Sequence, residues 1–189
     1  YEIHSGGGAT NAAAALSKLG LKTGVITKLG DDHDAEFILQ ELKKFDIKVL
    51  NKIRSKHHTD NSTIVSSKKD KDRVILVHKE ASSDLTIKDV PIKILKKAKW
   101  VYLGSVMGKS ETVMKSVMSS IKKNKVNLLF NPSHYMASQG YKKLKPFLSA
   151  SSIVILNKEE AQAMMKDKKS GIKKLLIKIS RLGPKKVLI

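Results

Sequence analysis

The sequence predicts an α/β fold in which helices cover both faces of a mostly parallel sheet. The first observation is a regular alternation of β-prone runs with amphipathic helical patterns from residue 91 to residue 189. The second is that several β-prone runs end in polar or glycine-containing segments, as strands do when they stop at one edge of a sheet. Strands that alternate with helices imply right-handed crossovers, which place neighbouring strands parallel.

Each expected element rests on its own pattern. The β-prone runs predict strands at 21–28, 100–104, 126–130, 153–156 and 185–189. The helical patterns predict helices at 36–45, 111–123, 139–148, 158–165 and 172–182. Between them, three short β-prone pieces are separated by polar links, at 49–53, 62–67 and 73–78. Residues 68–72 predict a hairpin turn, so this region is expected to form a small sheet with little core of its own.

The most informative stretch is Ser5–Gly20, with the sequence SGGGATNAAAALSKLG. Gly6 and Gly7 allow backbone conformations that are closed to other residues, and Asn11 adds an amide that both donates and accepts hydrogen bonds. The alanine-rich run after them favours a helix, whose N-terminal N–H groups suit an oxygen-rich ligand. A tight turn before a well-packed helix explains the glycines equally well. The spacing matches neither a dinucleotide-binding fingerprint nor a P-loop.

Composition limits the class of protein. The 189 residues, 41% of them hydrophobic, are enough for one sizeable core. There is no Cys, which excludes disulfides, thiolate metal sites and a cysteine nucleophile, and the six histidines lack a metal-binding spacing. The sequence shows no signal peptide and no apolar run of membrane-spanning length, so we expect a cytoplasmic protein without membrane contact.

The formal charge of +20 makes a basic nucleic-acid-binding module an alternative function. Arg is the usual bidentate reader of bases and phosphates, and aromatic side chains stack on bases. Only three of the 37 basic residues are Arg, and aromatic residues make up 5% of the chain. A lysine-rich solvated surface is therefore the interpretation that we favour, and nucleic acid is not expected as a partner.

Four expected strands end in segments that could serve a binding site. These segments are Gly30-Asp31-Asp32, Gly104-Ser105, Asn131-Pro132-Ser133 and Asn157-Lys158-Glu159-Glu160. In an open α/β sheet, ligands bind beyond the carboxyl ends of the strands. Each segment also has a purely structural explanation: Asn131-Pro132 is typical of a turn, and Asn157 and Glu160 have the spacing of a capping box. The residues by themselves leave both interpretations open.

Taken with the glycine stretch, the following residues complete a larger pattern. The G-G-x-x-x-N motif that ends at Asn11, the alanine-rich helix, the run LGLKTGVITKLGDD and the next amphipathic helix resemble the start of a ribokinase-like (PfkB family) carbohydrate kinase. The resemblance implies a three-layer α/β/α fold with a mostly parallel sheet and a small inserted β lid. Two positions depart from the family pattern. Ala35 stands where the family usually has Gly, and Glu80-Ala81-Ser82 stands in place of Gly-Ala-Asn.

The resemblance also implies roles for particular residues. Substrate binding is implied for Gly6, Gly7, Asn11, Gly104 and Asn131. Organisation of Mg²⁺ and of the nucleotide phosphates is implied for Asn157 and Glu160, with Glu160 as the metal residue and ATP as the phosphoryl donor. The family's catalytic Asp belongs to a G-A-G-D motif that this sequence lacks and that we expect beyond Ile189. No catalytic residue is assigned in this chain.

The same resemblance implies how the chain is divided. Residues 1–46 are expected to form the first part of the kinase core, 47–80 the β-rich lid, and 81–189 the continuation of the core without its nucleotide-binding part. The expected activity is ATP-dependent phosphorylation of a sugar hydroxyl, with this chain inactive by itself and a homodimer formed through the lid. The alternatives are a nucleoside kinase of the same fold, a degenerate and inactive relative, and the nucleic-acid-binding module.

Overall fold

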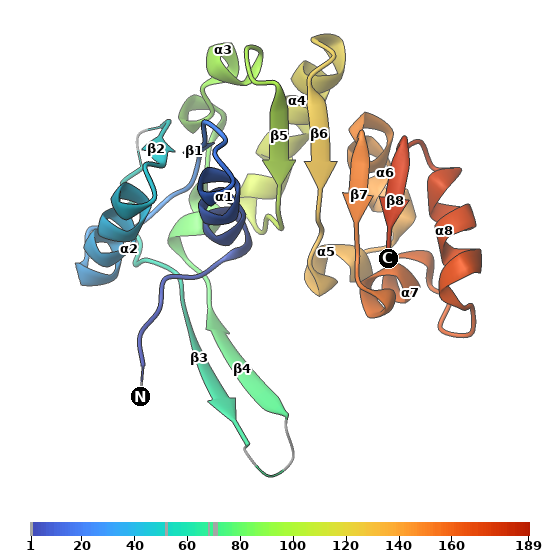
Figure 1. The fold of residues 1–189 in the computed structure, drawn as a ribbon, viewed down its shortest axis with the longest axis horizontal. Coiled ribbons are helices and arrows are strands. Elements are labelled where there is room, and N and C mark those ends of the chain that lie inside the picture. The colour runs from blue at the N-terminus through green and yellow to red at the C-terminus, as the bar shows by residue number, and fades with distance from the viewer. Residues whose placement is uncertain (1, 52, 68, 70–71) are drawn as a thin grey trace.

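The computed structural model describes residues 2–51, 53–67, 69 and 72–189, and its largest sheet has four parallel strands (Figure 1). They pair in the order β5 (Trp100–Leu103), β6 (Asn127–Phe130), β7 (Ile153–Ile155) and β8 (Lys186–Leu188). At least one helix connects each strand to the next. The parallel α/β sheet predicted from the alternation of patterns is therefore confirmed.

The main core lies between this sheet and the helices that cover it. Leu128 and Val154, on the two central strands, have no exposed surface. Figure 1 shows α4 (Lys109–Lys123) and α6 (Tyr141–Ala150) behind the sheet, and α1 (Gly8–Lys18) beside its edge strand β5. Helix α4 buries residues at helical spacing, namely Met114, Val117, Met118 and Ile121. This apolar stripe is what holds α4 against the sheet.

The expected helix 139–148 is α6, which begins and ends two residues later, and a separate helix that was not predicted, α5 (His134–Ser138), precedes it. The break occurs at Gly140, whose φ of 84° lies in the left-handed region that favours glycine. The Gly140 N–H donates to the carbonyl of Ala137 and closes α5. Helical spacing of apolar residues does not reveal a break of this kind, because it reports faces of a helix and not the backbone angle of one residue.

The last two helices follow the prediction closely. Helix α7 (Lys158–Met165) has the expected bounds, and α8 (Ile172–Ser180) ends two residues before the expected position. Their fully buried residues, which include Met164 and Leu175, join the main core. No helix among the described residues has both the length and the apolar character needed to cross a membrane.

A second and smaller core holds the N-terminal part together. Strands β1 (Gly24–Val25) and β2 (Lys48–Val49) pair in parallel, and α2 (His33–Lys44) connects them. Helices α1 and α2 bury apolar side chains against this pair, and the buried cluster is Ala13, Val25, Leu42 and Ile47. Helix α1 also contacts β5, although β1 and β5 belong to separate sheets in the described part of the chain.

The expected strand 21–28 is thus reduced to two residues. Beyond Val25 the backbone no longer pairs with a strand, and the side chain of Asn51 binds it instead. The Asn51 amide accepts from Thr27 N at 3.2 Å and donates to Thr27 O at 2.8 Å. The β-prone piece 49–53 accordingly starts in the small parallel sheet and not in the hairpin; residue 52 lies outside the described residues.

A hairpin projects from the body between the two cores (Figure 1). Its strands, β3 (Asn61–Ser66) and β4 (Arg73–His78), are antiparallel and in register from the Asn61–His78 pair to the Ser66–Arg73 pair. All twelve of these residues are exposed, including apolar side chains that point to both faces: Ile64, Val65, Val74, Ile75, Leu76 and Val77. Of the expected turn, residues 68, 70 and 71 lie outside the described residues.

Two carboxylates hold the base of the hairpin. Asp32 caps α2 by accepting from Ala35 N and also accepts from Thr59 N at 2.7 Å and from Thr59 Oγ1 at 2.6 Å. Asp60 accepts from Glu80 N at 3.0 Å and from Ser82 N at 3.1 Å, and it pairs with Lys79. The segments on both sides of the hairpin are therefore tied to the body and to each other.

After the hairpin, the chain returns to the sheet through three short helical turns. These are η1 (Ala81–Asp84), η2 (Ile87–Asp89) and α3 (Ile92–Leu95), which Pro91 precedes as the N-cap. Asp89 forms a mostly buried ion pair with Lys28, whose Nζ lies 2.8 Å from Asp89 Oδ1. This pair fixes the returning segment against the residues that follow β1.

Candidate functional site

Three of the four predicted strand exits meet at the carboxyl edge of the large sheet. Strands β5, β6 and β7 run in the same direction in Figure 1, so Gly104, Asn131 and Asn157 emerge from one edge. The first two exits are linked directly, because Ser105 Oγ lies 2.7 Å from Ser133 Oγ. The remaining exit, Gly30-Asp31-Asp32, has a structural role instead, because Asp32 caps α2 and binds Thr59 at the hairpin base.

Asn131 connects three neighbouring strands at this edge. Its backbone N–H donates to Leu103 O at 2.9 Å, and its side-chain Nδ2 donates to Ile155 O at 2.8 Å. Its Oδ1 accepts from the hydroxyl of Tyr102 at 3.2 Å. Most of the hydrogen-bonding capacity of the Asn131 amide is therefore used within the protein, and one Nδ2–H and one lone pair of Oδ1 are left for a ligand.

The glycine turn lies beside this connection. Gly7 is the N-cap of α1 with a φ of 96°, a conformation that L side chains rarely adopt. A Cβ atom built on Gly8 would lie 3.8 Å from Tyr102 Oη, and one built on Gly104 would lie 3.5 Å from Tyr102 Cε1 and 3.9 Å from Ala9 N. The first turn of α1, Gly104 and Tyr102 are thus in close proximity. A Cβ on Gly6 would meet no atom within 4 Å, so this residue borders open space.

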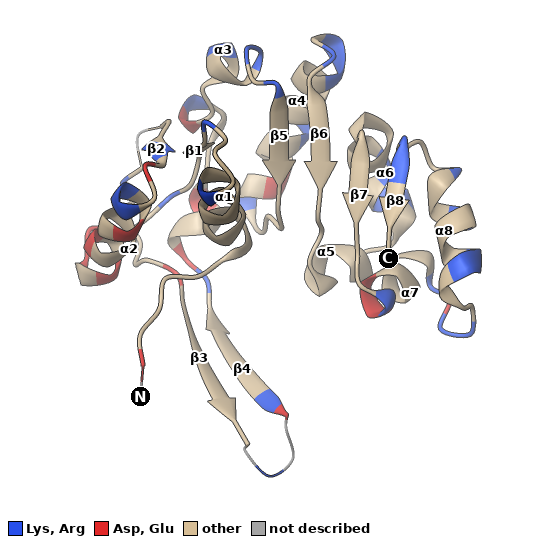
Figure 2. Cartoon of the chain, viewed as in Figure 1, with Lys and Arg blue, Asp and Glu red and all other residues tan. Residues whose placement is uncertain are grey.

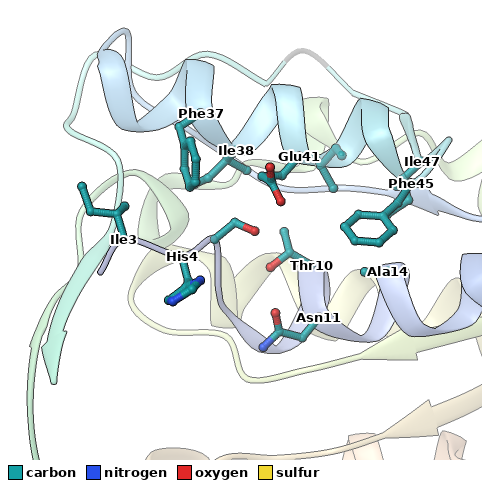
Figure 3. A pocket seen from close by; sticks show the side chains of 12 residues that line it. Ile3, His4, Thr10, Asn11, Ala14, Phe37, Ile38, Glu41, Phe45 and Ile47 are labelled. Atoms are coloured by element: carbon teal, nitrogen blue, oxygen red, sulfur yellow. The ribbon is translucent and has the colours of Figure 1, made fainter. Parts of the chain in front are cut away.

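Asn11 lies one turn into α1, close in sequence to the glycine turn. Its exposed side chain has no hydrogen-bond partner within the described residues. It lines a cavity of about 500 Å³ between α1 and α2, whose polar rim includes His4, Ser5 and Thr10 (Figure 3). The opposite wall comes from α2 and the residues after it and is largely apolar: Phe37, Ile38, Leu42, Phe45 and Ile47.

Asn157 and Glu160 form the predicted capping box at the start of α7. Glu160 N donates to Asn157 Oδ1 at 2.8 Å, and Asn157 N donates to Glu160 Oε2 at 2.9 Å. Both bonds satisfy N–H groups that the first turn of a helix leaves unpaired. Glu160 Oε1 has no partner among the described residues, so one carboxylate oxygen of the cap is unpaired.

The negative charge of Glu160 acts on Tyr102, near the end of β5. Burial, and secondarily the negative charge of Glu160, raise the pKa of the Tyr102 hydroxyl above its usual value of 10.0. The phenol therefore keeps its proton at neutral pH. The negative charge of the capping box therefore acts on the Tyr102 hydroxyl that binds Asn131.

The donor set of this edge is suited to water-mediated contact with Mg²⁺. Mg²⁺ prefers oxygen ligands, keeps several waters, and is commonly held by one or two carboxylates together with substrate phosphates. Within the described ranges no three His, Asp or Glu side chains are grouped so that they could enclose a metal ion. Glu160 thus offers a single free carboxylate oxygen, which fits this mode and not a cage of protein ligands.

Tyr102 is the site residue that the sequence did not predict. The only signal in the sequence is its position two residues before the glycine that ends the run WVYLG. An aromatic residue in a β-prone run is ordinarily explained by packing. Its link to Asn131 spans 29 positions, which no local pattern reports.

Comparisons with known proteins agree with this geometry. The pfkB family of carbohydrate kinases matches residues 1–189. A Pyrococcus horikoshii protein described as an uncharacterized sugar kinase is 26% identical over 193 residues, which cover 98% of this chain and 62% of that protein. The 2-dehydro-3-deoxygluconokinase of Bacillus subtilis is 35% identical over 88 residues, 45% of this chain and 27% of that protein.

Solved structures show the same fold. Ribokinase from Giardia lamblia superposes with a TM-score of 0.78 at 22% identity, covering 94% of this chain and 57% of ribokinase. Fructokinase from Halothermothrix orenii gives a TM-score of 0.78 at 18% identity, covering 97% of this chain and 68% of fructokinase. The expected ribokinase-like fold is confirmed, and the chain spans less than two thirds of the first two relatives named. The match over its whole length shows that the chain belongs to the pfkB family of carbohydrate kinases.

Proposed function

We propose that this chain is the acceptor-binding part of a kinase that transfers a phosphoryl group from ATP to a hydroxyl group of a sugar. The observation that carries the proposal is the assembly at the carboxyl edge of the sheet. There the glycine turn adjoins Tyr102, Tyr102 donates to Asn131, and the charge of Glu160, which keeps one carboxylate oxygen free, acts on Tyr102. Membership of the pfkB family supports a sugar as the acceptor.

Each proposed binding residue has a physical task. Gly6 and Gly7 allow the backbone to approach the sugar closely, and Asn11 supplies an amide without a protein partner. Gly104 leaves room beside the first turn of α1, and Asn131 holds the strand exits in place. Positioning of this kind supplies most of the acceleration in phosphoryl transfer, because the protein itself takes little part in covalent chemistry.

Glu160 and Asn157 are proposed to organise the metal and the phosphates. Mg²⁺ bound to the nucleotide would neutralise the charge that develops during transfer. Glu160 Oε1 would hold one of its water ligands, while Oε2 stays on Asn157 N and keeps the side chain oriented. We propose that the catalytic Asp and the adenine pocket lie in sequence beyond Ile189. This agrees with the 62% of the Pyrococcus horikoshii relative that the chain spans.

The hairpin is proposed to act as the lid within region 47–80, between the core regions 1–46 and 81–189. Its two faces expose apolar side chains that a closed, sugar-bound state and a second copy of the chain would cover. Ile64 and Ile75 are cross-strand partners on one face, and Val65 and Val74 are partners on the other. A homodimer through one face would be detected as a doubled mass in sedimentation equilibrium, and Ile75→Lys should abolish it if that face is used.

The distribution of charge argues against a nucleic-acid-binding module. Figure 2 shows Lys and Arg on helices, strand ends and loops in both halves of the chain, and acidic residues at the start of α7 beside the candidate site. A nucleic-acid site usually gathers its basic residues on one face or along one element. A solvated lysine-rich surface in the cytoplasm accounts for this distribution.

The proposal is tested by ADP release from the complete gene product that contains this chain. The acceptors are D-fructose, D-ribose, D-glucose, 2-dehydro-3-deoxygluconate and adenosine, each with ATP and Mg²⁺. We expect release with at least one sugar and a strong dependence on Mg²⁺. Release with adenosine alone would assign a nucleoside kinase, and no release with any acceptor would refute the proposed function. Salt-sensitive binding of duplex DNA that survives Asn11→Ala and Glu160→Gln would favour the nucleic-acid alternative instead.

A further inference from the structure

The direction of one hydrogen bond at the carboxyl edge is determined by its surroundings. The side chain of Asn131 faces the carbonyl oxygen of Ile155 at 2.8 Å, and a carbonyl can only accept. The amide must therefore turn its Nδ2 toward Ile155, which leaves Oδ1 facing Tyr102. Because Oδ1 can only accept, the Tyr102 hydroxyl must be the donor in this pair. Its one proton is thus committed to Asn131.

A hydroxyl whose proton is committed in this way can only accept from a ligand. Tyr102 Oη keeps free lone pairs, and the first turn of α1 lies close by, since a Cβ on Gly8 would be 3.8 Å away. The phenol is protonated at neutral pH, as its ordinary pKa of 10.0 requires, and burial and then the charge of Glu160 raise that pKa further. Tyr102 consequently presents an acceptor of fixed direction next to the glycine turn.

We infer that Tyr102 is a specificity-determining residue whose hydroxyl accepts a hydrogen bond from a hydroxyl group of the substrate. Asn131 is then a positioning residue, which acts by fixing the proton of Tyr102. The inference rests on the proposed function and names its substrate class: a neutral sugar with a hydroxyl at this position, in preference to a sugar acid with its carboxylate there.

The charges around Tyr102 support a neutral substrate. Glu160 is the only charged group among the described residues that shifts the pKa of Tyr102. A carboxylate placed there would face an acceptor and the like charge of Glu160. The three arginines, which bind carboxylates best, lie elsewhere. Arg54 binds Gly30 O and Glu36, Arg73 begins β4 in the hairpin, and Arg181 follows α8.

The test is a double-mutant-type cycle, in which the Tyr102 hydroxyl and one substrate hydroxyl are removed separately and then together. It uses Tyr102→Phe in the complete gene product, with the panel sugar that has the highest kcat/KM, D-fructose first, and its monodeoxy analogues. We expect Tyr102→Phe to lower kcat/KM for the parent sugar by about 10- to 100-fold, as for a hydroxyl that loses its buried partner. Removing one particular sugar hydroxyl should cost wild type a similar factor. With that analogue, Tyr102→Phe should cause little further loss.

Two variants control this experiment. Tyr141→Phe makes the same chemical change on α6, where the hydroxyl has no partner among the described residues, and kcat/KM should stay within about twofold. Asn131→Ala frees the Tyr102 proton and should weaken the discrimination between the parent sugar and the critical analogue. A thermal midpoint of Tyr102→Phe within a few degrees of wild type excludes unfolding as the cause of the loss.

The possible outcomes separate this inference from the proposed function. The role of Tyr102 would be overturned, while the kinase activity stands, by either of two results. One is an unchanged kcat/KM in Tyr102→Phe, and the other is that the loss from Tyr102→Phe adds to the loss from the missing sugar hydroxyl for every deoxy analogue. A wild-type preference for 2-dehydro-3-deoxygluconate over all neutral sugars would overturn the substrate class. No ADP release with any acceptor would refute the proposed function, and this inference with it.

Discussion

Gly30→Ala is predicted to destabilise the protein, because the added methyl group has no space. A Cβ atom at this position would lie 2.5 Å from Asp32 Oδ2, 2.6 Å from His57 O and 2.7 Å from Thr59 N. Real Cβ contacts are essentially never shorter than 3.0 Å, and two of the three atoms belong to the backbone. Thr59 is only 1% exposed, so the segment cannot move outward without opening the buried base of the hairpin.

The size of the effect follows from the bonds that must break. Separating these atoms removes the bond from Thr59 N to the Asp32 carboxylate and strains the bond from Gly30 N to Thr59 Oγ1. A buried bond to a charged group is worth about 1.5–3 kcal/mol, and a neutral one about 0.5–1.5 kcal/mol. Replacing Gly by Ala returns about 0.4–1 kcal/mol by restricting the unfolded chain. The free energy of unfolding should therefore fall by about 1–4 kcal/mol.

Urea denaturation followed by circular dichroism measures this change, and Gly6→Ala is the matched control. A Cβ on Gly6 would meet no atom within 4 Å, and this glycine does not have a positive φ, so the control should change the free energy of unfolding by less than about 0.5 kcal/mol. Thermal unfolding should shift by roughly 2–4 °C per kcal/mol for a chain of this size. If both variants unfold at the same urea concentration, the steric argument for Gly30 at the base of the hairpin is refuted.

Three further predictions concern the site and the hairpin base. Glu160→Gln keeps the capping geometry and should raise the Mg²⁺ concentration that gives half-maximal rate, while it lowers the free energy of unfolding by only about 0.3–1 kcal/mol. Glu159→Gln is the control. Unchanged Mg²⁺ dependence in Glu160→Gln would show that Glu160 is a cap alone. Asn11→Ala should weaken sugar binding by about 1–3 kcal/mol in calorimetry without affecting unfolding, and unaltered affinity would remove Asn11 from the site. Burial opposes ionisation of Asp60, but hydrogen bonds from Ser82, Lys79 and two backbone N–H groups outweigh it and lower its pKa. Its contribution to stability should therefore be complete above about pH 5 and be lost as pH falls through the folded-state pKa. Wild type and Asp60→Asn should differ in unfolding free energy at pH 7, and the difference should shrink as the pH falls through that lowered pKa, whereas a constant difference would contradict this origin.

Local features of this protein could be predicted because nearby residues determine them. The capping box joins Asn157 and Glu160 across three positions, and α7 has the expected bounds. The buried stripe of α4 follows from apolar residues at helical spacing. The parallel sheet follows from the alternation of elements, since a strand, a crossover helix and the next strand have few ways to pack.

The composition of the candidate site depends on strand exits that are distant in the sequence. Asn131 binds Tyr102 across 29 positions and Ile155 across 24 positions. These bonds exist because two crossovers bring β5, β6 and β7 to the same edge in a specific register. The sequence indicates that each exit is polar, but it does not reveal which polar groups form hydrogen bonds with each other and which stay free for a ligand.

What the sequence alone determined is therefore the family, the parallel sheet and the residues available at its edge. Only the tertiary structure decided how they are used. Asp32 binds Thr59, 27 positions away, at the base of the hairpin, and the Asn51 side chain binds Thr27 where the strand 21–28 was expected to continue. Tyr102 binds Asn131 and so belongs to the site. The physical reason is that helical faces, caps and turns depend on residues within about one turn of one another. The direction of a proton, or a free carboxylate oxygen, depends instead on what distant segments place beside it.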